Sequence, residues 1–260
     1  MSSFPLADPS APGLPTAALI YGLAVVVGYG LGSIPFGYFV GRRYGIDIRE
    51  HGSGNIGATN VLRVLGKKPG YLVFICDMLK GVAAVRLVLA LAQALLARAV
   101  DQGANVHGLF DPAGISSSEQ YAAYLRGAAT PAGIVAAVAC ILGHNFPVWL
   151  RFRGGKGVAT TVGVLLGLMP LSLGVSAVVW VVVFYSLRYV SLASLLAAAV
   201  LPVSVWFIKV RRDSANLPLF YFSLVAAALI WWRHRANIRR LLNGTEARFV
   251  PSPDPAEPLP

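Results

Sequence analysis

The chain has 260 residues, of which 56% are hydrophobic and only 13% are charged, and its mean hydropathy is +0.66. Soluble domains carry about 25% charged residues, so this composition leaves too little polar surface for a soluble globule. The net charge of +11 indicates loops that face anionic lipid and anionic substrates rather than nucleic acid. Cys76 and Cys140 lie in apolar segments and form no zinc or disulfide pattern. We therefore expect an integral membrane protein with no metal and no cofactor.

The long apolar runs lack the strict alternation of a β-barrel, and several approach the roughly 20 residues that span a bilayer as a helix. The sequence thus predicts an all-α, polytopic membrane protein with about seven transmembrane helices. The predicted spans are 17–41, 71–99, 131–150, 158–170, 172–187, 190–208 and 217–232. The fourth is short and is separated from the fifth by Pro170, so one bent helix or a re-entrant hairpin is the alternative for that pair.

Charge placement predicts the orientation. With the N-terminus outside and the C-terminus cytoplasmic, most of the 22 Lys and Arg residues fall on the cytoplasmic side, as the positive-inside rule requires. Residues 1–16 then form an external extension, and 17–249 form a single membrane domain with an external loop at 101–130. That loop carries a short predicted surface helix around 118–126. The Pro-rich tail 250–260 is predicted to be disordered.

Two glycine-rich basic stretches are set into this chain, both on the predicted cytoplasmic face. They run from Gly52 to Arg63 and from Gly143 to Gly157. Glycines let backbone N–H groups approach an anion, and Lys or Arg adds charge. Each loop is expected to hold one phosphate, although which loop holds which phosphate stays open. For either loop alone, the alternative is a tight turn whose lysine reaches lipid phosphates.

The residues expected to bind phosphate or substrate in these two loops are Ser53, Gly54, Asn55, Gly57, Thr59, Asn60, Arg63, Gly154, Gly155, Lys156 and Gly157. Gly157 also opens a predicted helix, whose free N–H groups and dipole favour an anion. Neither stretch is a nucleotide P-loop, because glycine rather than Ser or Thr follows the lysine.

Further polar residues lie at the ends of the predicted spans. His144 is either a proton carrier or a backbone cap. Asp77 and Lys80 are three residues apart on one helix face inside a span, which indicates either a site or a structural ion pair. Arg86 lies deeper and has no partner in the sequence.

Two pairs at the cytoplasmic side share a helical face by their spacing of three residues. Ser191 and Ser194 begin the sixth span, and small-residue helix packing is the alternative for them. His234 and Asn237 follow the seventh span, where a basic stop-transfer anchor is the alternative. We expect these four residues to position a hydroxyl-bearing substrate.

Taken together, these motifs resemble the bacterial acyl-phosphate:glycerol-3-phosphate acyltransferase family of the PlsY type, from about Gly32 to Phe249. The strings that carry the resemblance are Gly32–Gly37, Gly52–Arg63 with Gly66–Lys68, Asp77–Gly81, Gly143–His144 with Pro147, Phe152–Thr160, Arg188–Ser194 and His234–Glu246. Ala236 stands where the family often has Glu, and the 101–130 loop and both termini look longer than usual.

The resemblance implies a seven-helix fold and a cytoplasm-facing active site in the bacterial inner membrane. It implies acyl transfer from acyl phosphate to the 1-hydroxyl of glycerol 3-phosphate, which gives 1-acyl-glycerol 3-phosphate and inorganic phosphate for phospholipid synthesis. The expected catalytic residues are His144, Lys156, His234 and Asn237. The expected partners are the two substrates and the lipid bilayer, with no nucleic acid and no obligate protein partner.

No Ser-His-Asp or Cys-His arrangement and no His-x-x-x-x-Asp pattern is evident in the chain. Acyl phosphate is already activated, so proximity and charge neutralisation are expected to supply most of the acceleration. We therefore expect no covalent acyl-enzyme, with the hydroxyl proton passing to a phosphate oxygen of the donor. An anion transporter, a non-catalytic lipid-binding scaffold and a metal-dependent CDP-alcohol phosphotransferase are the competing classes. The clustering of polar groups at one interface argues against a transporter, and the two glycine-rich anion loops argue against a scaffold. The scarcity of aspartates argues against the phosphotransferase.

Overall fold

The computed structural model describes residues 13–101, 118–211 and 216–249, and the regular elements in these ranges are all helical. The α-helices are α1 (Gly13–Gly32), α2 (Phe36–Arg43), α3 (Ala58–Leu65), α4 (Lys67–Asp101), α5 (Ser118–Asn145), α6 (Val158–Leu168), α7 (Pro170–Leu187), α8 (Val190–Val205), α9 (Leu217–Arg233) and α10 (Arg235–Leu242). Short helical turns lie at Ile48–Glu50 (η1), Val148–Leu150 (η2) and, as a π-helix, Trp206–Val210 (η3).

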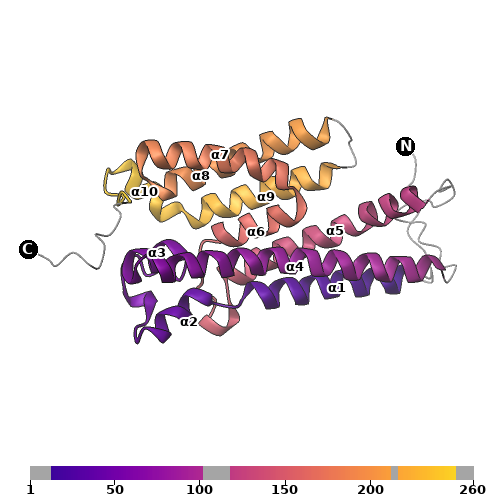
Figure 1. Ribbon diagram of the computed structural model, residues 1–260, viewed down its shortest axis with the longest axis horizontal. Helices are drawn as coiled ribbons and strands as arrows, with labels where there is room; N and C mark the ends of the chain where they lie inside the picture. The colour runs from indigo at the N-terminus through magenta and orange to yellow at the C-terminus, as the bar shows by residue number, and fades with distance from the viewer. Residues whose placement is uncertain (1–12, 102–117, 212–215, 250–260) are drawn as a thin grey trace, which may run out of the picture.

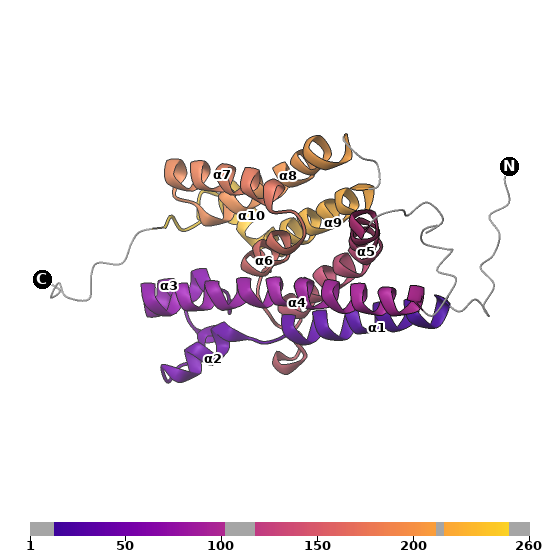
Figure 2. The ribbon, with the colours of Figure 1, turned by 45° about the vertical axis from the view of Figure 1, so that its right-hand side comes forward.

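The long helices form two layers (Figure 1, Figure 2). In one layer α1 packs along α5 and α4, and in the other α8 packs between α7 and α9. Helix α6 joins the layers, because it packs on α4 and α5 and leads directly into α7. The main core cluster lies where α4, α5, α6, α8 and α9 meet, around fully buried residues such as Val85, Ile141 and Leu201.

The contact between α4 and α6 depends on two glycines. A Cβ atom on Gly163 would overlap the backbone of Met78, and one on Gly81 would overlap the Thr160 carbonyl. Backbones approach this closely only where side chains are missing, which is a common way to pack helices in membranes. The contact holds the start of α6 beside α4 and therefore fixes the position of the glycine-rich segment that precedes α6.

The predicted apolar segments correspond to helices, but three boundaries differ. The segment 17–41 is divided into α1 and α2 at Pro35, whose missing N–H and fixed φ interrupt the helix. Helix α5 begins at Ser118, where the sequence predicts a short surface helix around 118–126, but it continues to Asn145, so 118–130 belong to this long helix rather than to a loop. Helix α4 has 35 residues and extends beyond both ends of the predicted span 71–99. Its length corresponds to about 50 Å.

The fourth and fifth predicted spans are separate helices, so the alternative of one bent helix is not what the structure contains. Helix α6 has 11 residues and packs on α4, whereas α7 begins with Pro170 and packs on α8. Proline is favourable at the first position of a helix and unfavourable inside one, which explains the break there. The predicted extension 1–12, the loop segment 102–117 and the tail 250–260 lie outside the described residues.

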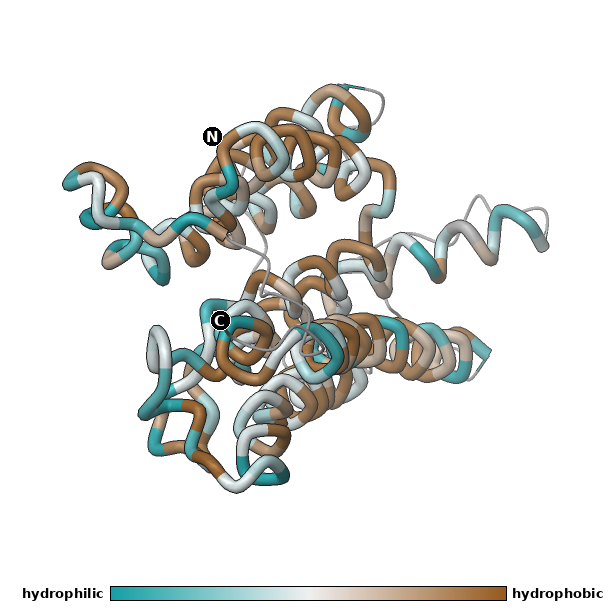
Figure 3. Tube along the Cα trace, turned by 60° about the vertical axis from the view of Figure 1, so that its left-hand side comes forward, coloured by the Kyte–Doolittle hydropathy of each residue, from teal (hydrophilic) through white to brown (hydrophobic). Residues whose placement is uncertain are grey.

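Within the described residues, four helical segments are long and apolar enough to cross a membrane: Pro15–Arg43, Ser118–Leu150, Pro170–Leu187 and Val190–Val210. A fifth is added if α9 and α10, which meet at a bend of 60°, form one broken span. Figure 3 shows the same pattern, with hydrophobic colour along the helices and hydrophilic colour mainly at their ends and loops. Length and composition therefore support several spans, but fewer than the seven predicted.

Candidate active site

The first glycine-rich loop is organised around the side chain of Asn60, which is 2% exposed. Its Oδ1 accepts a hydrogen bond from the Ser53 amide at 2.8 Å. Its Nδ2 donates to the carbonyls of Asn55 at 2.9 Å, His51 at 3.0 Å and Ile48 at 3.2 Å. Asn60 thus holds the loop's backbone together, and its predicted contact with substrate stays a prediction.

The same loop exposes other predicted donors. The side chains of Ser53, Thr59 and Arg63 are exposed, and Gly54 adopts a positive φ of 67°, which favours glycine. The Asn55 Oδ1 accepts from the Gly57 amide at 2.7 Å, so this amide already has a partner where it leads into α3. The loop therefore offers hydroxyl groups and a guanidinium at its surface.

The second loop, Gly154–Gly157, folds back onto the end of α5. The Gly154 amide donates to the Asn145 carbonyl at 3.1 Å, and the Gly155 amide donates to the His144 carbonyl at 3.0 Å. Arg233 at the end of α9 donates to the Gly155 carbonyl at 2.6 Å and to the Gly154 carbonyl at 3.2 Å. Both amides are therefore used within the protein, and the predicted phosphate contacts of these two glycines stay predictions.

Lys156 is the charged donor that this loop presents. Its Nζ donates to Asn237 Oδ1 at 2.7 Å, which joins the loop to α10. Burial lowers the pKa of Lys156 to about 8; nearby Glu246 acts in the opposite direction, and Arg240, Arg63 and Arg233 lower the pKa further. Because Arg63 belongs to the first loop's helix, this electrostatic effect shows that both loops contribute charge to one region.

Glu246 joins the remaining polar groups of this region. Its Oε1 accepts from Ser191 Oγ and from Asn237 Nδ2, both at 2.6 Å, and its Oε2 accepts from Arg240 Nε at 2.7 Å. Burial opposes ionisation of Glu246, but the hydrogen bonds from Ser191, Asn237 and Arg240 outweigh it and lower the pKa. A continuous chain of hydrogen bonds therefore runs from Lys156 through Asn237 and Glu246 to Ser191.

Ser194 and His234 use their polar atoms differently. Ser194 Oγ donates to the Val190 carbonyl at 2.8 Å and accepts from Trp180 Nε1 at 3.2 Å, so it serves the packing of α7 and α8. The His234 side chain is 3% exposed, and its Nδ1 lies 2.8 Å from the Ile230 carbonyl. The structure thus brings Ser191 into the network and leaves Ser194 outside it.

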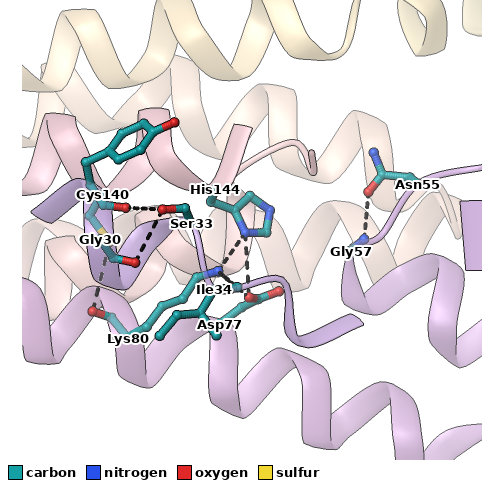
Figure 4. A network of polar contacts seen from close by, with 10 residues as sticks. Gly30, Ser33, Ile34, Asn55, Gly57, Asp77, Lys80, Cys140 and His144 are labelled. Atoms are coloured by element: carbon teal, nitrogen blue, oxygen red, sulfur yellow. Dashed lines mark hydrogen bonds and ion pairs between the residues drawn. The ribbon is translucent and has the colours of Figure 1, made fainter. Parts of the chain in front are cut away.

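His144 lies at the end of α5 in a second buried cluster. Its Nδ1 is 3.0 Å from Lys80 Nζ, and Lys80 forms an ion pair of 2.7 Å with Asp77. Figure 4 shows the three side chains meeting beside the carbonyl of Ile34. From the sequence, Asp77 and Lys80 were either part of a site or a structural ion pair. The structure places both of them in one buried cluster with His144.

Sequence reasoning gave no role in the site to Arg233, Arg240 and Glu246. From the sequence, Arg233 was interpreted as part of a basic membrane anchor. Its actual partners, two backbone carbonyls of the Gly154–Gly157 loop, are 78 and 79 residues away and could not be recognised from the sequence. Arg240 and Glu246 are six residues apart, and no helical periodicity pairs them. Among the described residues, no group of three His, Cys, Asp or Glu side chains is placed to hold a metal ion.

The fold and the site define a class: a helical membrane protein whose glycine-rich loops and cations converge at one end of the bundle. A family model described as glycerol-3-phosphate acyltransferase matches residues 22–244. The chain belongs to this family of integral membrane acyltransferases, which confirms the resemblance drawn from its motifs.

Individual relatives agree with this assignment. The glycerol-3-phosphate acyltransferase of Agrobacterium fabrum is 39% identical, over 90% of this chain and 94% of its own. That of Thermosynechococcus vestitus is 42% identical, over 90% of this chain and 97% of its own. A crystal structure of PlsY, an integral membrane glycerol 3-phosphate acyltransferase in its glycerol 3-phosphate form, has a TM-score of 0.68 at 36% identity and covers 88% of this chain and 96% of that chain. The lysophosphatidic acid form gives 0.66 at 35% identity, with 88% and 95% covered.

Proposed function

We propose that this protein transfers an acyl group from acyl phosphate to the 1-hydroxyl of glycerol 3-phosphate. The hydroxyl oxygen attacks the acyl carbon, the bond from that carbon to the phosphate oxygen breaks, and inorganic phosphate leaves. The products are 1-acyl-glycerol 3-phosphate and inorganic phosphate. The observation that carries the proposal is that Lys156 and Arg240 belong to one hydrogen-bonded network and that Arg233 holds the loop presenting Lys156, because two phosphate-bearing substrates need such a concentration of positive charge.

We assign the roles of the residues from the hydrogen-bond donors and acceptors that they keep available at the site. Lys156 and Arg63 hold phosphate oxygens, together with the Ser53 and Thr59 hydroxyls. Ser191, His234 and Asn237 hold the glycerol hydroxyls. Arg233 keeps the Gly154–Gly157 loop in place through its two carbonyl contacts. The acceleration comes from fixing two activated reactants side by side and neutralising their charge.

No protein nucleophile is required in this proposal. Acyl phosphate is a mixed anhydride with a good leaving group, and a phosphate oxygen of the donor takes the hydroxyl proton. The products then leave without a covalent acyl-enzyme. A pH–rate profile that requires an ionisable group near the ordinary pKa of histidine, and that loses it in His144→Ala or His234→Ala, would contradict the proton transfer to the donor.

The experiment uses purified full-length protein in lipid nanodiscs, with glycerol 3-phosphate and either palmitoyl phosphate or palmitoyl-CoA. We expect phosphate release together with lysophosphatidic acid from palmitoyl phosphate alone. Activity only with the thioester would keep the acyltransferase function and overturn the donor. No product from either donor would overturn the proposed reaction and favour anion transport.

We also propose seven membrane spans, with the N-terminus outside and the site at the cytoplasmic face of the bacterial inner membrane. The end of the bundle that holds α2, α3 and α10 carries the site (Figure 1). In a variant that lacks Cys76 and Cys140, a cysteine at exposed Ser118 is expected to react with an impermeant maleimide in intact cells. A cysteine at exposed Tyr44 is expected to react only after the cells are permeabilised. The reverse pattern would overturn the orientation.

A further inference from the structure

We propose that Lys80 fixes His144 in the tautomer that carries its proton on Nε2, which makes His144 a positioning residue for the Gly154–Gly157 loop. In this tautomer Nε2 of His144 is a hydrogen-bond donor and cannot accept a proton from the substrate. The inference rests on the proposed function, since the loop matters for the reaction that Lys156 supports. It concerns a residue beneath the loop and can be tested without turnover.

The hydrogen-bond chemistry of Lys80 decides the tautomer. An ammonium group has three N–H donors and no acceptor. In the structure Lys80 Nζ donates to the Ile34 carbonyl at 2.8 Å, forms an ion pair of 2.7 Å with Asp77 Oδ1 and lies 3.0 Å from His144 Nδ1 (Figure 4). His144 Nδ1 therefore accepts, and the proton of the neutral imidazole lies on Nε2.

The nearby carboxylate does not reverse this assignment. Asp77 Oδ1 is 3.5 Å from His144 Nδ1, which is longer than the 2.7–3.2 Å of an ordinary N–H to O hydrogen bond. The same oxygen is 2.7 Å from Lys80 Nζ, with which it forms an ion pair. Asp77 thus acts on His144 through Lys80.

All three side chains are buried, with exposed fractions of 2% for Asp77, 5% for Lys80 and 4% for His144. A buried ion pair contributes little net stability, because desolvation offsets much of the attraction, but removing one partner is strongly unfavourable. Such a cluster is therefore a poor means of stabilising a fold and a good means of holding one geometry.

The cluster of Asp77, Lys80 and His144 fixes the geometry of the Gly154–Gly157 loop. A Cβ atom on Gly155 would overlap His144 Nε2, so the backbone of Gly155 lies directly against the imidazole edge that carries the proton. The Gly155 amide donates to the His144 carbonyl at 3.0 Å. The side chain and the main chain of one residue thus both contact the glycine that precedes Lys156.

His234 provides a built-in contrast. Its Nδ1 lies 2.8 Å from the Ile230 carbonyl, which only accepts hydrogen bonds. Nδ1 therefore carries the proton, and Nε2 has the free lone pair. His144 and His234, the two buried histidines of the described residues, are thus in opposite tautomers, and of these two His234 presents an unprotonated Nε2.

The first test is ¹⁵N NMR of the full-length protein, labelled at histidine and held in lipid nanodiscs near neutral pH. We expect His144 to give a protonated-type Nε2 and an unprotonated-type Nδ1 resonance, and His234 to give the reverse. His144→Gln and His234→Gln assign the signals. A protonated Nδ1 or a charged imidazolium at His144 would overturn the proposal. This spectrum needs no substrate, so it stands or fails independently of the proposed reaction.

The second test changes Lys80. In Lys80→Met only Asp77 remains beside Nδ1, so the proton is expected to move to that nitrogen, and kcat/KM for glycerol 3-phosphate is expected to fall by about 10- to 100-fold. Lys80→Arg keeps the charge and donors and is expected to recover much of this loss. Arg86→Met is the matched control on the same helix, because Arg86 is exposed and is expected to leave activity within about twofold.

Two results would contradict the second part of the proposal. One is a Lys80→Met enzyme whose kcat/KM is unchanged although its His144 proton has moved. The other is a loss of activity that follows the loss of folded protein and is not recovered by Lys80→Arg. If Lys80→Met does not fold, Gly155→Ala is the substitute, because its new Cβ displaces the loop from His144 and is expected to lower kcat/KM without unfolding the bundle.

Discussion

A buried lysine and a half-buried lysine show how differently two regions of this molecule are built. Lys80, within the α1–α4–α5 layer, donates to the Ile34 carbonyl, lies 3.0 Å from His144 Nδ1 and forms an ion pair with Asp77 Oδ1. Lys156, between the layers, has one acceptor among the described residues, Asn237 Oδ1. The first ammonium is enclosed by protein groups that hold it in place, whereas the second has this one acceptor in the described part of the chain and two N–H groups left for a ligand. The binding capacity of a site therefore lies in its unsatisfied donors rather than in its number of charges.

Lys156→Ala should give the largest effect, because it removes the only ammonium with free donors in the site. We expect kcat/KM with palmitoyl phosphate to fall by about 10²–10³-fold, as when one donor to developing charge is removed elsewhere. Steady-state phosphate release measures this. Lys68→Ala, an exposed lysine at the start of α4, is the control, and an equal loss there would remove the distinction between the two kinds of lysine.

Glu246→Gln tests whether the network around Lys156 is an oriented unit. The variant keeps the shape but loses the charge that accepts from Ser191, Asn237 and Arg240. Hydrogen bonds to charged groups contribute about 1.5–3 kcal/mol, so we expect a loss in kcat/KM of about 10- to 100-fold. Glu50→Gln, at an exposed glutamate, is the matched control. Unchanged kinetics in Glu246→Gln would show that Asn237 and Lys156 are positioned without it.

The pH dependence sharpens the same comparison. The pKa of Lys156 is lowered to about 8, so its ammonium is present below that pH and is lost as pH rises through it. We expect kcat/KM to fall above pH 8 by about tenfold per unit, and Lys156→Arg to remove this fall because guanidinium stays charged. A profile of Lys156→Arg identical to that of the wild type would assign the fall to another group.

The smallest expected effects distinguish two serines on one helix face. Ser191 donates to Glu246, and Ser191→Ala is expected to raise KM for glycerol 3-phosphate by up to about tenfold. Ser194 bonds within the α7–α8 contact, and Ser194→Ala is expected to change KM by less than about twofold. Equal effects in the two variants, measured from initial rates, would place both hydroxyls in the binding site.

The sequence identified the two loops because their chemistry is local. The glycines, Ser53, Arg63 and Lys156 are recognisable from residue type and spacing, since loops that approach phosphate need small residues and positive charge. The helices were also recognisable, because apolar runs of this length have few other solutions in a membrane. Pro35 and Pro170 divided them where proline prevents a helix from continuing.

The partners of these residues were not local and could not be predicted. Ser191 and Ser194 share one helix face, yet only one reaches Glu246, 55 residues further along the chain. Asn60 was predicted as a substrate ligand, and its sequence position gave no sign that its amide contacts three carbonyls and one backbone N–H. The choice between binding and structural roles depends on which donors remain free, and periodicity carries no information about that.

The sequence by itself therefore determined the class of fold, the family and the position of the two glycine-rich segments, because composition, hydropathy and motif spacing are properties of the linear chain. The tertiary structure alone decided that Asp77 and Lys80 meet His144, that Arg233 holds the second loop, and that Lys156 is joined to Glu246 through Asn237. The physical reason is that hydrogen bonds form over about 3 Å in space, and the packing of α4, α5, α9 and α10 brings together groups that lie far apart in the chain.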